Sequence, residues 1–172
     1  ITMKHVIESV GPDVLRFIML TRKNDATLDF DMDKVLEESK ENPVYYVQYA
    51  YARVNSLLDK SKSLNLNNYK IDYSLLNNKE EVFLMKLMAK WPRFVEAAAK
   101  AHEPHRITIF LNDLAGALHS YWAKGNEDEK RRIIIEDDLL LTRSRLALAE
   151  TVQKLIGIGL KIIGVQPLDK LN

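Results

Sequence analysis

The fold of this chain is decided by the stretch Asn42-Pro43-Val44-Tyr45-Tyr46-Val47-Gln48-Tyr49-Ala50-Tyr51-Ala52-Arg53. Asn42 is a favourable N-cap because its side-chain oxygen can accept from an unpaired N–H of the first helical turn. Pro43 suits the first helical position, where the N–H that proline lacks has no intrahelical partner in any case. The stretch therefore predicts a helix that begins at residue 43, and the apolar spacing extends it to about Lys60.

This predicted helix has two opposed faces. One is an apolar stripe at the three-four spacing of a core-facing helix, made of Val44, Val47, Tyr51, Val54 and Leu58. The other is centred about 145° away, at about 100° per residue, and is made of Tyr46, Tyr49 and Arg53. Phenol rings beside a guanidinium suit unstacked bases and a phosphate backbone. Taken alone, the helix is better explained by tyrosines that cover the edge of a core with the hydroxyl in water.

Size and charge bound the class of protein. The chain has 172 residues, of which 47% are hydrophobic and 28% charged, as in a globular protein with a packed core. Its net charge of +1 provides no global field, so any nucleic-acid site must be local. The absence of cysteine excludes disulfides and thiolate metal sites. With neither a signal peptide nor an apolar run of about 20 residues, we expect a cytoplasmic protein without a membrane partner.

Helical periodicity dominates the rest of the chain. It predicts helices at 2–10, 12–20, 31–41, 79–98 with a break near Pro92, 103–123 and 138–163. A turn with one extended piece is expected at 24–31, and loops are expected at 61–78 and 124–138. Gly157 and Gly159 would permit close approach of a neighbouring helix. Four long helices with a small N-terminal piece predict an all-α bundle.

No motif indicates chemistry within this chain. The segment His102-Glu103-Pro104-His105 lacks the His-Glu-x-x-His spacing of a zinc helix, and a structural role explains it better. The acidic cluster at 29–33 lacks the glycine of a calcium loop, and capping explains it better. No nucleophile elbow, phosphate-binding glycine loop or dinucleotide fingerprint is present. We therefore predict no catalytic residue, no metal ligand and no cofactor-binding residue.

A second aromatic concentration lies at 119–126. Trp122 directly follows Tyr121, so the two rings cannot both face one core, and one of them should face a groove or a partner. A tryptophan that is half-buried at the end of a bundle is the alternative. Arg143 and Arg145 are interpreted as balancing the acidic residues at 136–138.

Several segments carry a resemblance when taken together and in order. They are VGPDVLRF (10–17), LDFDMD (28–33), ENPVYYVQYAYAR (41–53), EPHR (103–106), LHSYW (118–122), RLAL (145–148) and GLKIIGV (159–165). Over nearly its whole length the chain resembles the arginyl-tRNA synthetases, a family of class I synthetases. The family usually has His in place of Tyr51 and Met in place of Leu171.

The resemblance implies a C-terminal fragment. Residues 1–40 would be the connector from the catalytic domain, resembling a stem-contact segment, and residues 41–172 would be the α-helical anticodon-binding domain. The family's His-x-Gly-His and Met-Ser-Lys-type signatures are not in this sequence, so the fragment alone is predicted to be inactive. ATP, with Mg, would serve the parent enzyme. The implied partners are the tRNA for arginine and the missing catalytic domain, and not DNA.

The resemblance also assigns residues to RNA binding. The implied contacts are Tyr46, Tyr49, Arg53, Tyr121, Trp122 and Leu171. Gln48 is close in sequence but lies to one side of that face. The competing class is a helical protein–protein interaction module, in which the same aromatic face would dock a partner helix.

Overall fold

The computed structural model describes residues 2–28, 30–37, 39 and 41–171, so Ile1, Asp29, Glu38, Lys40 and Asn172 lie outside the described residues. Within these ranges the regular elements are all helical, which confirms the all-α prediction. The elements are α1 (Met3–Val10), α2 (Pro12–Met19), α3 (Met32–Leu36), α4 (Pro43–Ser61), η1 (Tyr73–Leu75), α5 (Lys79–Met88), α6 (Trp91–Ala101), α7 (His105–Glu127), η2 (Glu129–Arg131) and α8 (Leu139–Ile162).

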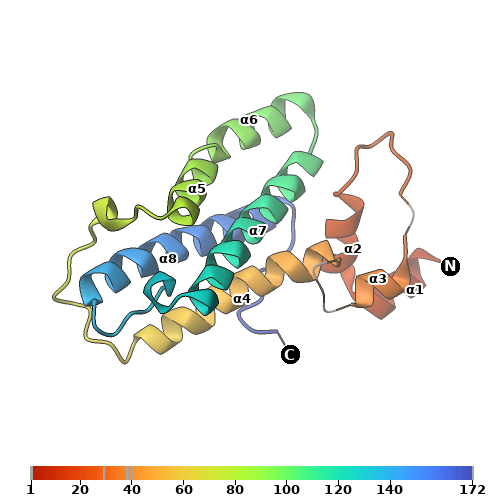
Figure 1. Cartoon of the computed structure of the whole chain (residues 1–172). Helices are drawn as coiled ribbons and strands as arrows, with labels where there is room; N and C mark the ends of the chain where they lie inside the picture. The colour runs from red at the N-terminus through yellow and green to blue at the C-terminus, as the bar shows by residue number, and fades with distance from the viewer. Residues whose placement is uncertain (1, 29, 38, 40, 172) are drawn as a thin grey trace.

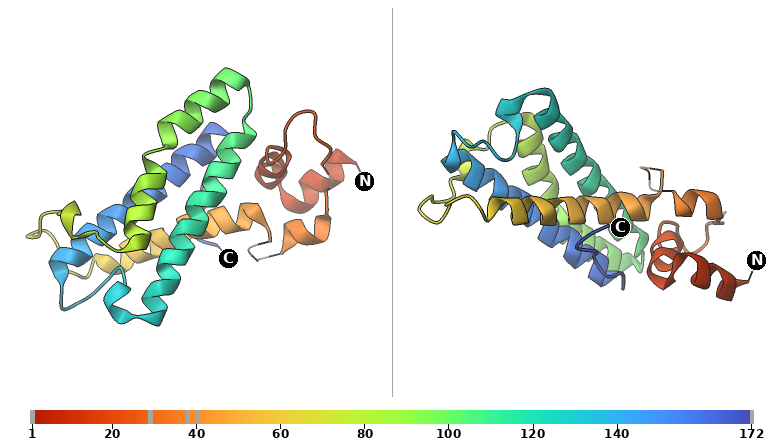
Figure 2. Two further views of the ribbon diagram at one scale, coloured as in Figure 1. Left: turned by 45° about the horizontal axis from the view of Figure 1, so that its top comes forward. Right: turned by 90° about the horizontal axis from the view of Figure 1, so that it is seen from below.

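The bundle is organised around α7, which packs against α4, α5, α6 and α8 (Figure 1). Its side chains Phe110, Leu111 and Leu114 are fully buried, as are Val152 and Ile156 of α8. The short helices α1, α2 and α3 form a separate group at one end of the bundle, next to the start of α4 (Figure 2). None of the helices in the described ranges has the length and apolarity needed to cross a bilayer.

The start of α4 is fixed by Asn42, as the sequence predicts. Its Oδ1 accepts from the N–H groups of Val44 and Tyr45 at 3.1 and 3.2 Å. Its Nδ2 donates to the carbonyls of Val35 and Glu37 at 2.7 and 3.0 Å. One buried side chain therefore ends α3 and begins α4. This explains why α3 stops at Leu36, earlier than the predicted end near residue 41.

The other predictions about helix ends and loops are partly confirmed. The predicted break near Pro92 separates α5 from α6. A Cβ on Gly159 would lie 2.6 Å from the Leu111 side chain, so a larger residue at this position of α8 would force the Leu111 side chain of α7 to shift. Helix α7 continues to Glu127, into the segment predicted to be a loop. The described residues at 27–30 form no strand, and Asp29 of that piece is outside the described residues.

A buried polar network joins α5, α7, α8 and the loop after α7. The Glu81 carboxylate is fully buried and accepts from Arg145 Nε at 2.7 Å and from the Tyr121 hydroxyl at 2.9 Å. Arg145 also donates to the carbonyls of Lys130 and Arg132 at 2.8 and 2.7 Å. The interpretation that Arg145 balances residues 136–138 is therefore wrong, because its partner is a carboxylate on another helix.

Candidate nucleic-acid interface

The second face of α4 is divided between a half-buried and an exposed tyrosine. Tyr49 is 37% exposed and its ring stacks on that of Tyr45 at 5.8 Å between centroids. Tyr46 is half-buried, with its ring 4.5 Å from that of His119 on α7. The His119 ring also stacks on Tyr49 at 5.4 Å. His119 thus braces both tyrosines from the neighbouring helix, and Tyr49 is the one that reaches the surface.

Arg53 lies between two aromatic rings. Its guanidinium carbon is 5.4 Å from the centre of the Tyr49 ring and 4.0 Å from the centre of the Trp122 ring. Both distances are within the range of a cation–π contact. Partial burial lowers the pKa of Arg53, but a guanidinium remains protonated in any case. The cation is therefore held in one orientation, with rings on either side.

These residues line a surface groove of about 510 Å³. Its lining comes from three separate parts of the chain: α4, the end of α7 and the C-terminal tail. The residues are Tyr49, Ala52, Arg53, Ser56, Leu57, Lys60, Trp122, Lys170 and Leu171. Four of the six residues assigned from sequence, namely Tyr49, Arg53, Trp122 and Leu171, are thus brought together. Tyr46 is not among the residues that line the groove.

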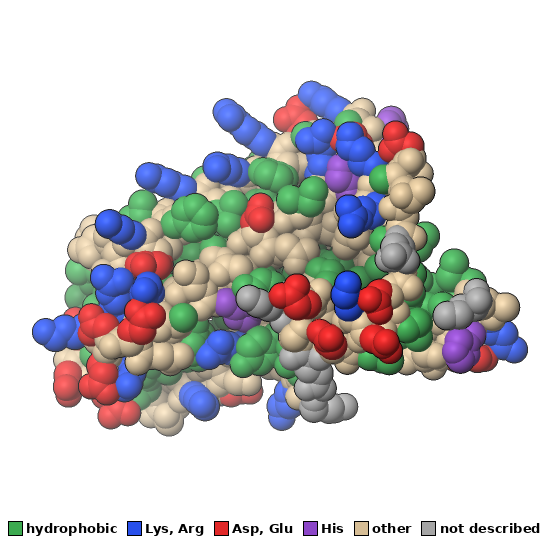
Figure 3. Space-filling view, turned by 45° about the vertical axis from the view of Figure 1, so that its right-hand side comes forward, with side chains coloured by type: hydrophobic (Ala, Val, Ile, Leu, Met, Phe, Trp, Pro, Cys, Tyr) green, Lys and Arg blue, Asp and Glu red, His purple; other side chains and the backbone are tan. Residues whose placement is uncertain are grey.

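The groove is locally basic although the chain is nearly neutral. Arg53, Lys60 and Lys170 all line it. The charge of Lys170 also reaches Asp59, whose pKa lies below its ordinary value mainly because of a hydrogen bond from Lys62 and to a smaller extent because of Lys170. Elsewhere the charges alternate: Figure 3 shows positive and negative side chains interspersed over one face of the molecule. A local cluster of cations suits a phosphate backbone better than a dispersed charge would.

Tyr121 has to be removed from the predicted surface. Its ring is 1% exposed, and burial, followed by the charge of Glu81, raises the pKa of its hydroxyl. Of the two adjacent rings, Tyr121 therefore faces the core, while Trp122 is half-buried and lines the groove. The reason is the Glu81–Arg145 pair, which offers a buried acceptor to the Tyr121 hydroxyl and to no other ring.

Sequence reasoning missed three contributors to this region. His119, Lys60 and Lys170 were not assigned, although His119 falls within the aromatic segment already noted. Its location one helical turn before Trp122 is the signal that could have indicated it. Lys60 and Lys170 carry no such signal, because isolated lysines are ordinary surface residues.

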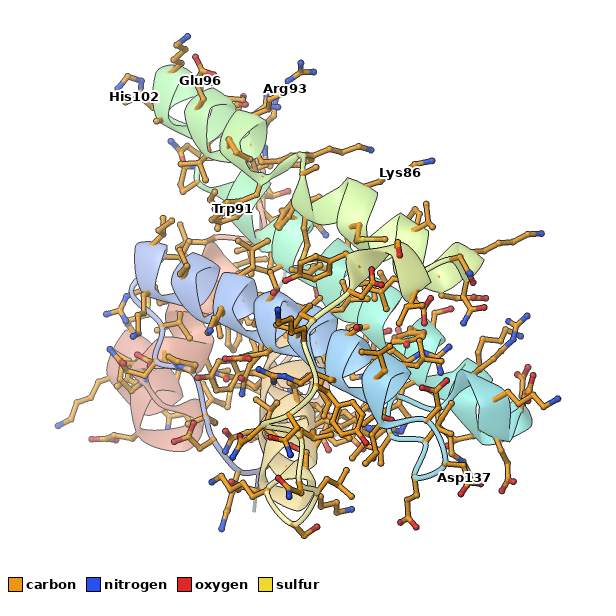
Figure 4. The ribbon with its side chains drawn as sticks, turned by 90° about the vertical axis from the view of Figure 1, so that its left-hand side faces the viewer. Lys86, Trp91, Arg93, Glu96, His102 and Asp137 are labelled. Atoms are coloured by element: carbon orange, nitrogen blue, oxygen red, sulfur yellow. The ribbon has the colours of Figure 1, made fainter. Side chains whose placement is uncertain are left out.

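The described residues contain no cluster of metal-binding side chains. Figure 4 shows His102 at the outer end of α6, pointing away from the bundle. His102 ends α6 in the left-handed region, with φ 55°, so its role is structural. Asp31 caps α3 by accepting from Asp33 N and Lys34 N, as the capping interpretation of the acidic cluster predicts.

The protonation state of His119, which packs against Tyr46 and Tyr49, depends on pH. Burial lowers its pKa; the bond from Nε2 to the Tyr46 carbonyl, at 3.2 Å, opposes this, and the charge of Arg53 adds to the lowering. The ring is therefore neutral at neutral pH and donates from Nε2, because a carbonyl oxygen only accepts.

We expect stability to fall in mild acid through this residue. Since the pKa of His119 in the folded chain is below its unfolded value of about 6.5, the unfolded chain binds the proton more readily. This contribution to stability is present above about pH 6.5 and is lost as the pH falls through the folded pKa. His119→Gln, which retains an Nε2 donor, should show a smaller loss of the urea midpoint across that window. Parallel curves for the two proteins would contradict the assignment.

A family model described as the DALR anticodon binding domain matches residues 47–171. The chain is 50% identical over its whole length to an arginine–tRNA ligase of Ehrlichia chaffeensis, of which it covers 30%. It is 48% identical over 99% of its length to an arginine–tRNA ligase of Rickettsia africae, of which it covers 31%. The chain thus spans about 30% of the length of these curated relatives.

Among solved structures, the fold is similar to part of the arginyl-tRNA synthetase of Thermus thermophilus. The TM-score is 0.76 at 24% identity, and the match covers 95% of this chain and 27% of that protein. At this identity the likeness concerns the fold alone. It confirms the predicted type of helical bundle.

Proposed function

The chain belongs to the DALR anticodon-binding domain family, and from that membership we propose that it is the tRNA-binding part of an arginine–tRNA ligase. The observation that carries the proposal is the groove, which gathers Tyr49, Arg53, Trp122 and Leu171 beside two lysines. An anticodon loop is single-stranded, so its bases can be splayed out and stacked on aromatic rings. Its phosphates meet the three cations of the groove.

The proposal divides the site by chemistry. Tyr49 and Trp122 provide ring surface for loop bases, and Leu171 adds an apolar contact at the other wall. Arg53 binds a phosphate or a base edge through its planar guanidinium. Tyr46 supports Tyr49 through His119 and does not contact the RNA itself.

In this proposal the catalytic reaction takes place in the rest of the parent enzyme. There, arginine is activated with ATP and Mg and transferred to the 3′ end of the tRNA, in the cytoplasm. Residues 1–40 are proposed to connect that part to the bundle. In support, Thr108 of α7 donates to the carbonyl of Leu20 at 3.0 Å, and Phe17 of α2 is fully buried.

A salt titration tests the function. Binding of an arginine tRNA transcript should weaken steeply with salt, because neutralised phosphates release counterions. With Arg53, Lys60 and Lys170 engaged, log K against log salt should have a slope of about −2, at ~0.7 per single-strand phosphate. Filter binding measures this slope, with a transcript of altered anticodon loop as the control. A flat salt dependence is the signature of apolar helix docking and would overturn RNA binding.

A further inference from the structure

The C-terminal tail, residues 164–171, crosses α4 and forms one wall of the groove. It follows α8 and passes to α4, where Figure 1 shows the chain end. Lys170 and Leu171, at its end, line the groove together with Arg53. The tail contains no helix or strand of its own, so its position depends on contacts made with other elements.

The principal contact is a two-point clamp by Gln48. Its Nε2 donates to the Gln166 carbonyl at 2.8 Å, and its Oε1 accepts from the Leu168 N–H at 2.9 Å. The side-chain amide therefore pairs with the tail backbone at two residues, much as a neighbouring strand would. Gln48 is 4% exposed, so water competes little for these bonds.

Further contacts hold the tail nearer to α8. Val165 is fully buried, and the Asp13 carboxylate accepts from the Gln166 N–H at 2.8 Å. Arg16 donates to the carbonyl of Gly164. Beyond the clamp, the described part of the tail makes a weaker hydrogen bond, from Asn55 Nδ2 to the Asp169 carbonyl at 3.3 Å. The two hydrogen bonds of Gln48 are therefore the last short, buried contacts of the tail before the residues that line the groove.

We propose that Gln48 is a positioning residue for RNA binding, which orders the tail so that Lys170 and Leu171 form a preformed wall of the groove. This inference rests on the proposed function. Gln48 itself faces the tail and is absent from the groove lining, so it acts through the tail and not on the RNA. Because the tail is already ordered in the folded chain, RNA binding does not have to supply the entropy cost of ordering it.

The test is a double-mutant cycle on the 172-residue chain with a tRNA anticodon-arm hairpin as probe. Gln48→Leu should weaken binding about tenfold, equivalent to ~1.4 kcal/mol. Deletion of residues 170–172 should weaken it similarly. In the deleted chain, Gln48→Leu should have no further effect, because the wall that it positions is gone. Full additivity of the two changes would overturn the proposal.

Two substitutions at Leu168 keep the test informative if Gln48→Leu alters the fold. Leu168→Pro removes the N–H that Gln48 accepts from, whereas Leu168→Ala keeps it. We expect the proline variant to bind about tenfold more weakly and the alanine variant to bind like the parent chain, where tenfold is ~1.4 kcal/mol. Equal binding by both would overturn the clamp. If the parent chain binds the hairpin and Gln48→Leu binds equally well, only this inference fails; if the parent chain does not bind it, the proposed function fails as well.

Discussion

Arg145→Ala is expected to lower the free energy of unfolding by about 3–5 kcal/mol. The substitution leaves the Glu81 carboxylate fully buried without its cation. It also removes the donor that serves the carbonyls of Lys130 in η2 and of Arg132 directly after it. Removal of one partner of a buried ion pair is far more costly than loss of a surface pair, because the remaining charge cannot be solvated. Urea unfolding at neutral pH measures the change.

Two variants serve as controls for that result. Arg143→Ala, on the same helix but partly exposed, should change stability by no more than about 0.5 kcal/mol. The double change Glu81→Leu and Arg145→Met removes both charges and should recover part of the loss. A double variant less stable than Arg145→Ala would show that packing around the pair matters more than the buried charge.

Arg53→Ala is expected to weaken binding of the arginine tRNA by about ten- to hundredfold, or ~1.4–2.8 kcal/mol. The change removes a cation that is partly withdrawn from solvent and therefore less screened by salt. It also removes the guanidinium that packs against the rings of Tyr49 and Trp122, so both rings lose a contact that holds them in position. Filter binding with the same transcript, alongside thermal unfolding, separates lost affinity from lost fold.

The contribution of the rings is isolated by two further substitutions. Arg53→Lys keeps the charge but loses the planar stacking, so its affinity should lie between those of the parent chain and Arg53→Ala. Lys60→Ala removes an exposed cation from the same groove and should cost less affinity than Arg53→Ala. Equal losses for Arg53→Ala and Lys60→Ala would mean that charge alone matters and that the ordered rings do not.

Local signals were enough to predict α4 and its two faces. Capping by Asn42 and the 3.6-residue period depend on residues within a few positions of each other, so the sequence contains them directly. The same period implies that only one of Tyr121 and Trp122 can face the core. It cannot say which one, because the answer depends on a carboxylate 40 residues away from Tyr121.

What the sequence by itself determined is the helical class of the fold, the aromatic and cationic face of α4 and the family resemblance that the comparisons confirm. What only the tertiary structure decided is which side chains meet: Arg53 with Trp122, Arg145 with Glu81, and Gln48 with a tail 118 and 120 residues further along the chain. The physical reason is range. Helix periodicity and capping act between near neighbours, whereas these contacts exist only after α4, α7, α8 and the tail have packed together.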